Sequence, residues 1–156
     1  MDRAPQTVAS KMPDRKRIVD LLARATRDEM ESAIKDHGGL PDHVLLRGPD
    51  TGLVMIRGRI GGGGAPFNLG EATMSRASIR LADGRIGHGY RLGTDRKAVT
   101  LAAIIDAIAQ EERARTALDA GLFAALADRV VEEALQTRNE TAATKVDFFT
   151  MVRGED

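Results

Sequence analysis

The sequence predicts an α+β fold in which an antiparallel sheet of about four strands is packed with N-terminal and C-terminal helices. Three observations support this prediction. Apolar residues recur at helical spacing before residue 40 and again after residue 95. Short runs rich in Val, Ile and Leu cluster between residues 43 and 92, separated by turn-forming residues. Because these strands follow one another and do not alternate with helices, one α+β domain is expected over residues 14–156.

Two helices are expected before residue 40. Residues 1–13 mix Pro, Ser, Gln and Lys without periodicity and are predicted to be a flexible N-terminal arm. The first helix begins at Asp14, and its apolar positions are Ile18, Leu21, Leu22 and Ala25. Thr26 and Glu29 have the spacing of a capping box, in which each side chain accepts a hydrogen bond from the other's backbone N–H. The second helix therefore starts after Thr26 and runs to His37, before a pair of glycines.

The middle of the chain is predicted to form two hairpins. Gly48, Pro49 and Asp50 separate the first two runs, and Asp83-Gly84 supplies the positive backbone angles that a tight hairpin turn needs. The four expected strands are His43–Arg47, Gly52–Ile60, Glu71–Leu81 and Arg85–Leu92.

Two longer helices are expected after residue 94. Thr94 or Asp95 caps a stretch that is apolar almost all round, as expected of a helix buried on more than one side. Asp106 interrupts it, and either pairing with an arginine or a place on a narrow solvent stripe is favoured over a catalytic role, because no second carboxylate accompanies it. A final helix from about Leu122 is predicted to continue towards Val146, with a stripe of Leu122, Leu126, Val130, Ala134 and Leu135.

The composition excludes several classes of function. The absence of Cys from the 156 residues removes disulfides and thiolate chemistry, and three scattered histidines predict no metal site. The formal net charge is zero and aromatic residues make up 3%, so no nucleic-acid partner is expected. No apolar run is long enough for a membrane span and no secretory signal is visible, so a cytoplasmic protein is expected.

Arginines on the predicted sheet are candidate binding residues. Alternation separates Arg57 and Arg59 from the apolar side chains of their strand, and Arg76 and Arg80 from those of theirs. A solvated face with ion pairs is one interpretation. The other is that the planar guanidinium fork binds a carboxylate, a phosphate or a protein partner.

The glycine run next to these arginines resembles a phosphate cradle only in part. Gly62, Gly63 and Gly64 can direct backbone N–H groups at an anion, and they join Arg57 and Arg59 as candidate ligand-binding residues. A P-loop, however, needs Lys and Ser or Thr at the start of a helix, whereas Ala, Pro and Phe follow here. A permissive connection or docking loop is therefore favoured over a cradle.

His88 is the one histidine with a conceivable catalytic setting, between two glycines and near the single tyrosine. A general base is possible in principle, but strand parity places His88 and Tyr90 on the inward face with Ile86, which favours a hydrogen-bonded core histidine. On the opposite face, Gly87 and Gly89 would let another backbone or a ligand come close. No catalytic residue is assigned.

The C-terminal segment carries a cluster of large apolar residues where chains usually fray. Phe148, Phe149, Met151 and Val152 each gain about 1.5–3 kcal/mol on burial, so they are expected to pack either in the protein's own core or on another subunit.

Three strings of the sequence resemble one known family. They are TGLVMIRGRIGGGGAPFNLGEATMSRASIRLADGRIGHGY, GTDRKAVTLAAIIDAIAQ and VDFFTMVRGED, and together they are similar to the G subunits of the bacterial carbon-phosphorus lyase core complex. The resemblance covers most of residues 15–156. It implies a role in phosphonate catabolism, in which the G, H, I and L subunits displace adenine from ATP by a phosphonate to give a ribose 1-phosphonate 5-triphosphate.

The resemblance also implies partners. The I subunit is regarded as the nucleosidase and is the expected direct partner, the H and J subunits complete the core, and the L subunit acts functionally with them. This chain would bind no cofactor, and ATP would be a substrate of the complex. A direct ATP- or phosphonate-binding module that uses the arginine face and the glycine loop is the alternative. The expected partner-binding residues are Phe67, Asn68, Arg76, His88, Phe148, Phe149, Met151 and Arg153.

Overall fold

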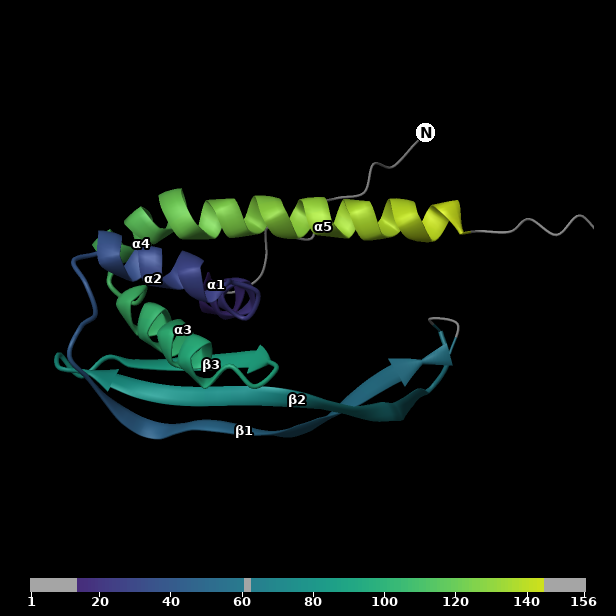
Figure 1. The fold of residues 1–156 in the computed structure, drawn as a ribbon, viewed down its shortest axis with the longest axis horizontal. Coiled ribbons are helices and arrows are strands. Elements are labelled where there is room, and N and C mark those ends of the chain that lie inside the picture. Colours follow the sequence, from purple (N-terminus) through teal and green to yellow (C-terminus); the bar gives the residue numbers. More distant parts are fainter. Residues whose placement is uncertain (1–13, 61–62, 145–156) are drawn as a thin grey trace, which may run out of the picture.

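The computed structural model describes residues 14–60 and 63–144, and these form the predicted α+β fold (Figure 1). A three-stranded antiparallel sheet in the order β1-β2-β3 lies below a layer of helices, all on the same side of it. The elements are α1 (Asp14–Leu22), α2 (Arg27–Asp36), β1 (His43–Arg59), β2 (Pro66–Leu81), β3 (Ile86–Leu92), α3 (Arg96–Ile108), α4 (Glu112–Leu118), the π-helix η3 (Asp119–Phe123) and α5 (Ala124–Ala143).

The first predicted hairpin is wrong, because its two strands are one continuous strand, β1. The register with β2 shifts between Leu45 and Arg47 and again between Arg47 and Asp50, so the extra residues bulge out without reversing the chain. Gly48 takes a positive φ of 69° there, and its peptide bond to Pro49 is cis. The second hairpin is confirmed: β2 and β3 are joined through Asp83-Gly84, and Gly84 has a φ of 92°.

The strand β2 begins at Pro66, so half of the predicted glycine-rich connection belongs to the sheet. β3 stops at Leu92 opposite Met74, whereas β1 and β2 continue together to the pair Arg59–Pro66. We call residues 53–60 and 66–73 the hairpin arm. Within the described chain no third strand pairs with it, and Figure 1 shows it projecting beyond α1 and β3.

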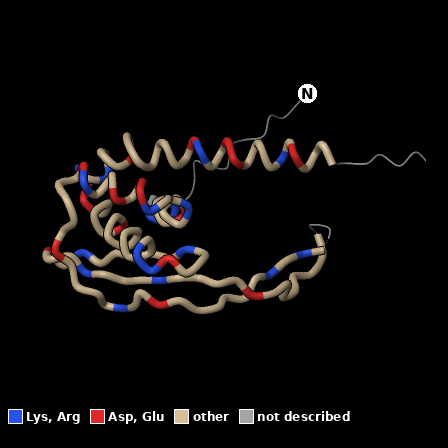
Figure 2. Tube along the Cα trace, viewed as in Figure 1, with Lys and Arg blue, Asp and Glu red and all other residues tan. Residues whose placement is uncertain are grey.

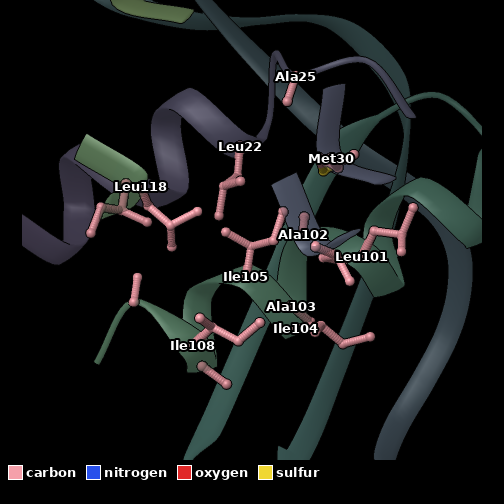
Figure 3. Packing of buried hydrophobic residues seen from close by; sticks show 14 of the residues in the cluster. Leu22, Ala25, Met30, Leu101, Ala102, Ala103, Ile104, Ile105, Ile108 and Leu118 are labelled. Carbon is pink, nitrogen blue, oxygen red and sulfur yellow. The ribbon is translucent and has the colours of Figure 1, made fainter. Parts of the chain in front are cut away.

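The core forms around α3, which packs on β2 and β3 and is covered by α1 and α2 (Figure 3). The prediction of a helix buried on more than one side is confirmed, because ten residues of α3 between Ala98 and Ile108 are buried. Gly87 and Gly89 allow this contact. A Cβ atom added to Gly87 would lie 1.9 Å from the Ala103 carbonyl oxygen, and one added to Gly89 would lie 2.2 Å from the Val99 carbonyl oxygen. The backbone that these glycines admit is that of α3.

The C-terminal helices differ from the prediction in extent. Helical structure starts at Glu112 and passes through η3 before α5 begins at Ala124. Of the predicted stripe only Leu126 is fully buried, and from Val131 onward α5 is exposed, with Leu135 at 54%. No helix in the described chain is long and apolar enough to cross a membrane. The predicted N-terminal arm and the apolar C-terminal segment lie outside the described residues.

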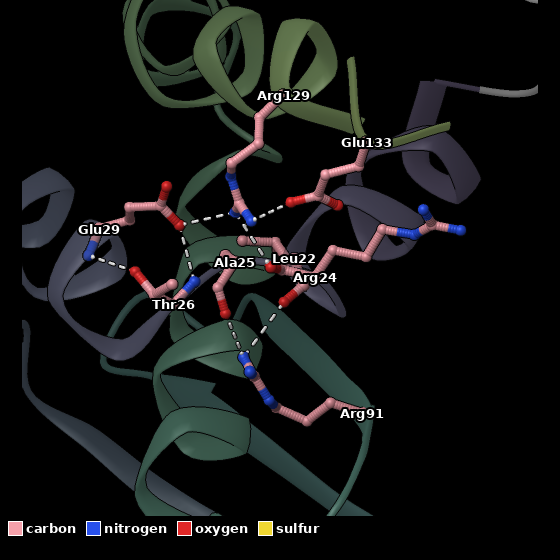
Figure 4. A network of polar contacts seen from close by, with 8 residues as sticks. All are labelled: Leu22, Arg24, Ala25, Thr26, Glu29, Arg91, Arg129 and Glu133. Carbon is pink, nitrogen blue, oxygen red and sulfur yellow. Dashed lines mark hydrogen bonds and ion pairs between the residues drawn. The ribbon is translucent and has the colours of Figure 1, made fainter. Parts of the chain in front are cut away.

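Polar contacts tie the helical layer together (Figure 4). The predicted capping box is confirmed, since Thr26 Oγ1 accepts from the Glu29 N–H at 3.2 Å and the Glu29 carboxylate accepts from the Thr26 N–H at 2.7 Å. Arg129 of α5 donates to that carboxylate at 3.0 Å. Arg91 of β3 donates to the carbonyl oxygen of Ala25 at 2.8 Å, just beyond the end of α1. A basic side chain there satisfies carbonyls that the helix leaves free.

Candidate partner-binding surfaces

The candidate ligand-binding residues lie at the tip of the hairpin arm. Arg57 and Arg59 line one open hollow of about 520 Å³ together with Gly58 and Pro66. The Arg59 guanidinium donates to the carbonyl oxygen of Gly64 at 3.3 Å. Gly64 therefore lies beside Arg59, while Gly62 falls outside the described residues. No helix follows the glycines, so the tip does not have the geometry of a P-loop.

The hairpin arm exposes large apolar side chains. Phe67 pairs with Gly58 across the two strands and is 40% exposed, and Asn68 pairs with Arg57. Leu53 and Leu69 are each 65% exposed. A two-stranded hairpin is at best marginally stable by itself in water, and contiguous exposed apolar surface marks an interaction site. The exposed large apolar residues of the arm are Leu53, Met55, Ile56, Ile60, Phe67 and Leu69.

The outer sheet face, on the side away from the helices, carries the other two candidates. Cross-strand pairing aligns Arg47 with Ser78 and His88 in one row, and Asp50 with Arg76 and Tyr90 in the next. These side chains do not face the helices, so the prediction that His88 and Tyr90 face inward is wrong. The reason is steric: α3 approaches positions 87 and 89 of β3 so closely that only glycine fits there, so the glycines and not His88 lie on the inner face.

His88 has a partner on this outer face. Its Nδ1 lies 2.9 Å from Ser78 Oγ, so a hydrogen bond is confirmed, but at the surface and not in the core. No carboxylate of the described residues completes a triad with this hydroxyl-imidazole pair, since Asp106 accepts from the His88 backbone N–H at 2.8 Å and not from the imidazole.

Asp106 serves the structure. It is 1% exposed and takes two hydrogen bonds from Arg15, at 3.2 Å to Oδ1 and 2.9 Å to Oδ2, which confirms the predicted arginine pairing. Hydrogen bonding to Asp106 raises the pKa of Arg15. Within residues 14–60 and 63–144 there is no group of three or more His, Asp or Glu side chains placed to hold a metal ion.

The arginines of the sheet divide into two groups. Arg91 of β3 and Arg85, which precedes that strand, act inside the chain: Arg85 donates to the carbonyl oxygen of Ile108, and Arg91 to that of Ala25. In the described chain, no ion pair is formed by the arginines of β1 and β2, which are Arg47, Arg57, Arg59, Arg76 and Arg80. For Arg57, Arg59, Arg76 and Arg80 the predicted ion pairs are therefore wrong, whereas the predicted exposure to solvent is found for Arg57, Arg59 and Arg80. Figure 2 shows basic positions near the end of the arm and an acidic position on the neighbouring strand, further from the end.

The sequence reasoning missed a second hollow. A space of about 390 Å³ lies between α2 and the α4–η3 segment, with Ala33, Leu118 and Leu122 among its lining residues. The signal for it was the four-residue spacing of Ala117, Gly121 and Ala125, whose small side chains leave room beside the helix. It brings together no predicted site residue.

Comparison with known proteins decides the family. The family model described as phosphonate metabolism protein PhnG matches residues 13–154. The chain belongs to the PhnG family. A PhnG protein of Rhizobium meliloti (strain 1021), named as alpha-D-ribose 1-methylphosphonate 5-triphosphate synthase subunit PhnG, is 50% identical over 156 residues. The match covers 100% of this chain and 99% of that protein. The predicted resemblance to the G subunits is thus confirmed, and the uncovered surfaces belong to a PhnG-family chain.

Proposed function

We propose that this chain is a non-catalytic subunit of the complex that transfers ribose triphosphate from ATP to a phosphonate with release of adenine. The R. meliloti relative is named as a subunit of the synthase that makes such a product. The complex takes ATP as its substrate, acts in phosphonate catabolism in the cytoplasm, and requires no cofactor bound by this chain.

The hairpin arm is the observation that carries this proposal. Its apolar residues have no cover from the described chain, and its arginines have no carboxylate. In contrast, the groups that suit catalysis are engaged in the fold: Asp106 holds Arg15, and His88 is bonded to Ser78. A chain whose catalytic types of side chain are held in its own fold, and whose arm exposes apolar surface, fits a subunit that positions others.

We propose the I subunit as the direct partner of the arm and the outer sheet face, with the H and J subunits completing the core and the L subunit acting with them. Phe67 and Asn68 would make contact from the arm, and Arg76 and His88 from the outer sheet face. The segment that contains Phe148, Phe149, Met151 and Arg153 is proposed as a further contact.

Single substitutions on the arm test the proposal. We expect Leu53→Ser and Leu69→Ser each to weaken binding to the co-expressed I subunit by at least about tenfold, because fully burying a leucine side chain contributes about 1.5–3 kcal/mol and about 1.4 kcal/mol is a factor of ten. Leu40→Ser is the matched control, since Leu40 is 62% exposed but lies between α2 and β1, away from the arm. Affinity is measured by titration calorimetry on purified chains.

The outcome separates an interface from general damage. An arm that binds the I subunit gives two weakened variants and a control within about twofold of the original chain. Equal affinities for all three variants would remove the arm from the interface, and a wild-type chain that forms no complex would remove the proposed function.

A further inference from the structure

We infer that the tip of the hairpin arm binds the triphosphate group of a nucleotide within the assembled complex, through the guanidinium groups of Arg57 and Arg59. The inference rests on the proposed function, because the arm tip by itself is an open hollow and becomes a site only when a partner covers it. It assigns to this chain a positioning role toward the substrate that a purely structural subunit would lack.

The first step is the geometry of the tip. Arg57 and Arg59 lie two residues apart on β1, with only Gly58 between them, and both line the same hollow. The Arg59 guanidinium is anchored by the Gly64 carbonyl oxygen at 3.3 Å, which uses one of its five N–H donors and leaves the rest free. The planar guanidinium groups of Arg57 and Arg59 therefore lie at the same end of the arm.

The second step is the lack of an internal counter-charge. Several other arginines of the chain pair with carboxylates, as Arg15 does with Asp106 and Arg27 with Asp95, both within 2.9 Å. Neither tip arginine has an ion pair in the described chain. The nearest acidic residue along either arm strand is Glu71, which pairs with Met55 at the base and not at the tip.

The third step is what happens when the arm is covered. Ile60 is 77% exposed and Phe67 is 40% exposed, and they adjoin the two arginines on both strands. A partner that buries these apolar side chains also takes the guanidinium groups out of water. A charge that loses its water needs an opposite charge and hydrogen bonds in return.

The fourth step chooses the anion. Two adjacent cations without an acid between them match one multiply charged anion better than one carboxylate, and guanidinium forks bind phosphate oxygens in two-pronged fashion. The R. meliloti relative is named as a subunit of a 5-triphosphate synthase. A triphosphate is therefore the anion that the proposed function brings to the complex.

The test uses the assembled complex and inorganic tripolyphosphate, which has the phosphates of the nucleotide without its adenosine. We expect Arg57→Ala and Arg59→Ala each to raise the dissociation constant for tripolyphosphate by at least about tenfold, since charge-assisted hydrogen bonds are stronger than neutral ones. Adenosine, which has no phosphate, should bind the complex with unchanged affinity. Arg57→Lys and Arg59→Lys should recover only part of the loss, because an ammonium group cannot bind two oxygens as a fork.

Arg113→Ala supplies the matched control. Arg113 is an exposed arginine of α4 without an ion pair in the described chain, and it lies at the other end of the molecule. It should leave tripolyphosphate affinity within about twofold. Assembly is measured in parallel by the affinity of each variant for the partner subunits.

Two results would overturn the inference without touching the proposed function. One is a complex that assembles and binds tripolyphosphate equally well with all variants. The other is an arm variant that loosens the complex but leaves tripolyphosphate affinity unchanged, which would mean that the arginines pair with carboxylates of the partner. A wild-type chain that fails to assemble would instead contradict the proposed function.

Discussion

The body of the molecule and the hairpin arm use the same kinds of residue in opposite ways. In the body, β2 and β3 bury Ala77 and Ile79 against α3, and Arg91 bonds to carbonyls at the end of α1. In the arm, Leu53 of β1 and Leu69 of β2 are each 65% exposed, and Arg57 and Arg59 form no ion pair within the described chain. The difference is cover: α3 crosses one half of the sheet and not the other (Figure 1).

This comparison separates stability from function. Burial and hydrogen bonding in the body provide the folding free energy, so substitutions there should alter unfolding. The arm contributes few contacts to the isolated chain, so its substitutions should alter assembly and ligand binding. The predictions below measure how sharp this division is, beginning with the largest expected effect.

Gly87→Ala should be the most damaging single substitution. The added Cβ would lie 1.9 Å from the Ala103 carbonyl oxygen and 2.7 Å from the Ala107 backbone nitrogen, so α3 must move off the sheet. We expect the free energy of unfolding to fall by about 3 kcal/mol or more, measured by urea denaturation.

Gly70→Ala is the matched control in the arm. A Cβ there meets nothing within 4 Å, and the backbone needs no positive φ. We expect a change within about 0.5 kcal/mol, in the stabilising direction, because alanine restricts the unfolded chain. Similar losses at both glycines would mean that the arm is packed as tightly as the body.

Asp106→Ala should have the next largest effect. The carboxylate is 1% exposed, and its removal leaves the Arg15 guanidinium and the His88 backbone N–H without their acceptor. We expect a loss of about 2–3 kcal/mol by urea denaturation, moderated because Arg15 remains half exposed to water. Asp50→Ala on the outer sheet face, where the aspartate is exposed, should cost less than about 0.5 kcal/mol. A comparable cost at Asp50 would show that the outer sheet face is not free.

Local signals explain which parts of this architecture could be predicted from sequence. The capping box of Thr26 and Glu29 and the Asp83-Gly84 turn depend on neighbours within four residues, and both were predicted correctly. Gly48-Pro49 looked like another hairpin turn. The same residues also suit a bulge, and pairing with the distant strand β2 decides between them.

The candidate surfaces depended on tertiary structure that alternation does not reveal. His88 was placed inward because Ile86 and Tyr90 share its parity, but the inner face was decided by how closely α3 approaches Gly87. The pairing of Arg57 and Arg59 on one face was visible in the sequence. The exposure of Leu53 was not, because an apolar strand residue reads the same whether or not a helix covers it.

A smaller effect is expected at Glu29, where the body pairs charges across elements. Burial acts to raise the pKa of the Glu29 carboxyl, but hydrogen bonds from Thr26 and the charge of Arg129 outweigh it and hold that pKa below its ordinary value of 4.5. Because the pKa of Glu29 is lower in the folded state, its carboxylate stabilises the fold at pH values above the pKa of the unfolded state. This stabilisation is lost as the pH falls through the pKa of the folded state.

Glu29→Gln should therefore reduce the free energy of unfolding by about 0.2–1 kcal/mol at pH 7, because glutamine can keep the capping hydrogen bond but loses the charge that faces Arg129. The difference from the original chain should persist down to about pH 4.5 and close at lower pH, measured by urea denaturation across the range. Glu71→Gln in the arm, where no ion pair is formed in the described chain, should show no difference at either pH. A gap that widens on acidification would contradict the role of Glu29.

The smallest effect on folding is expected where the effect on assembly is largest. Leu53→Ser and Leu69→Ser should leave the unfolding free energy of the isolated chain within about 0.5 kcal/mol, because both side chains are already 65% exposed. Leu22→Ala, by comparison, empties a position that is 1% exposed and should cost about 2–5 kcal/mol. If the arm variants unfolded as easily as Leu22→Ala, some part of this chain would already cover the arm, and no partner would be needed to explain its apolar surface.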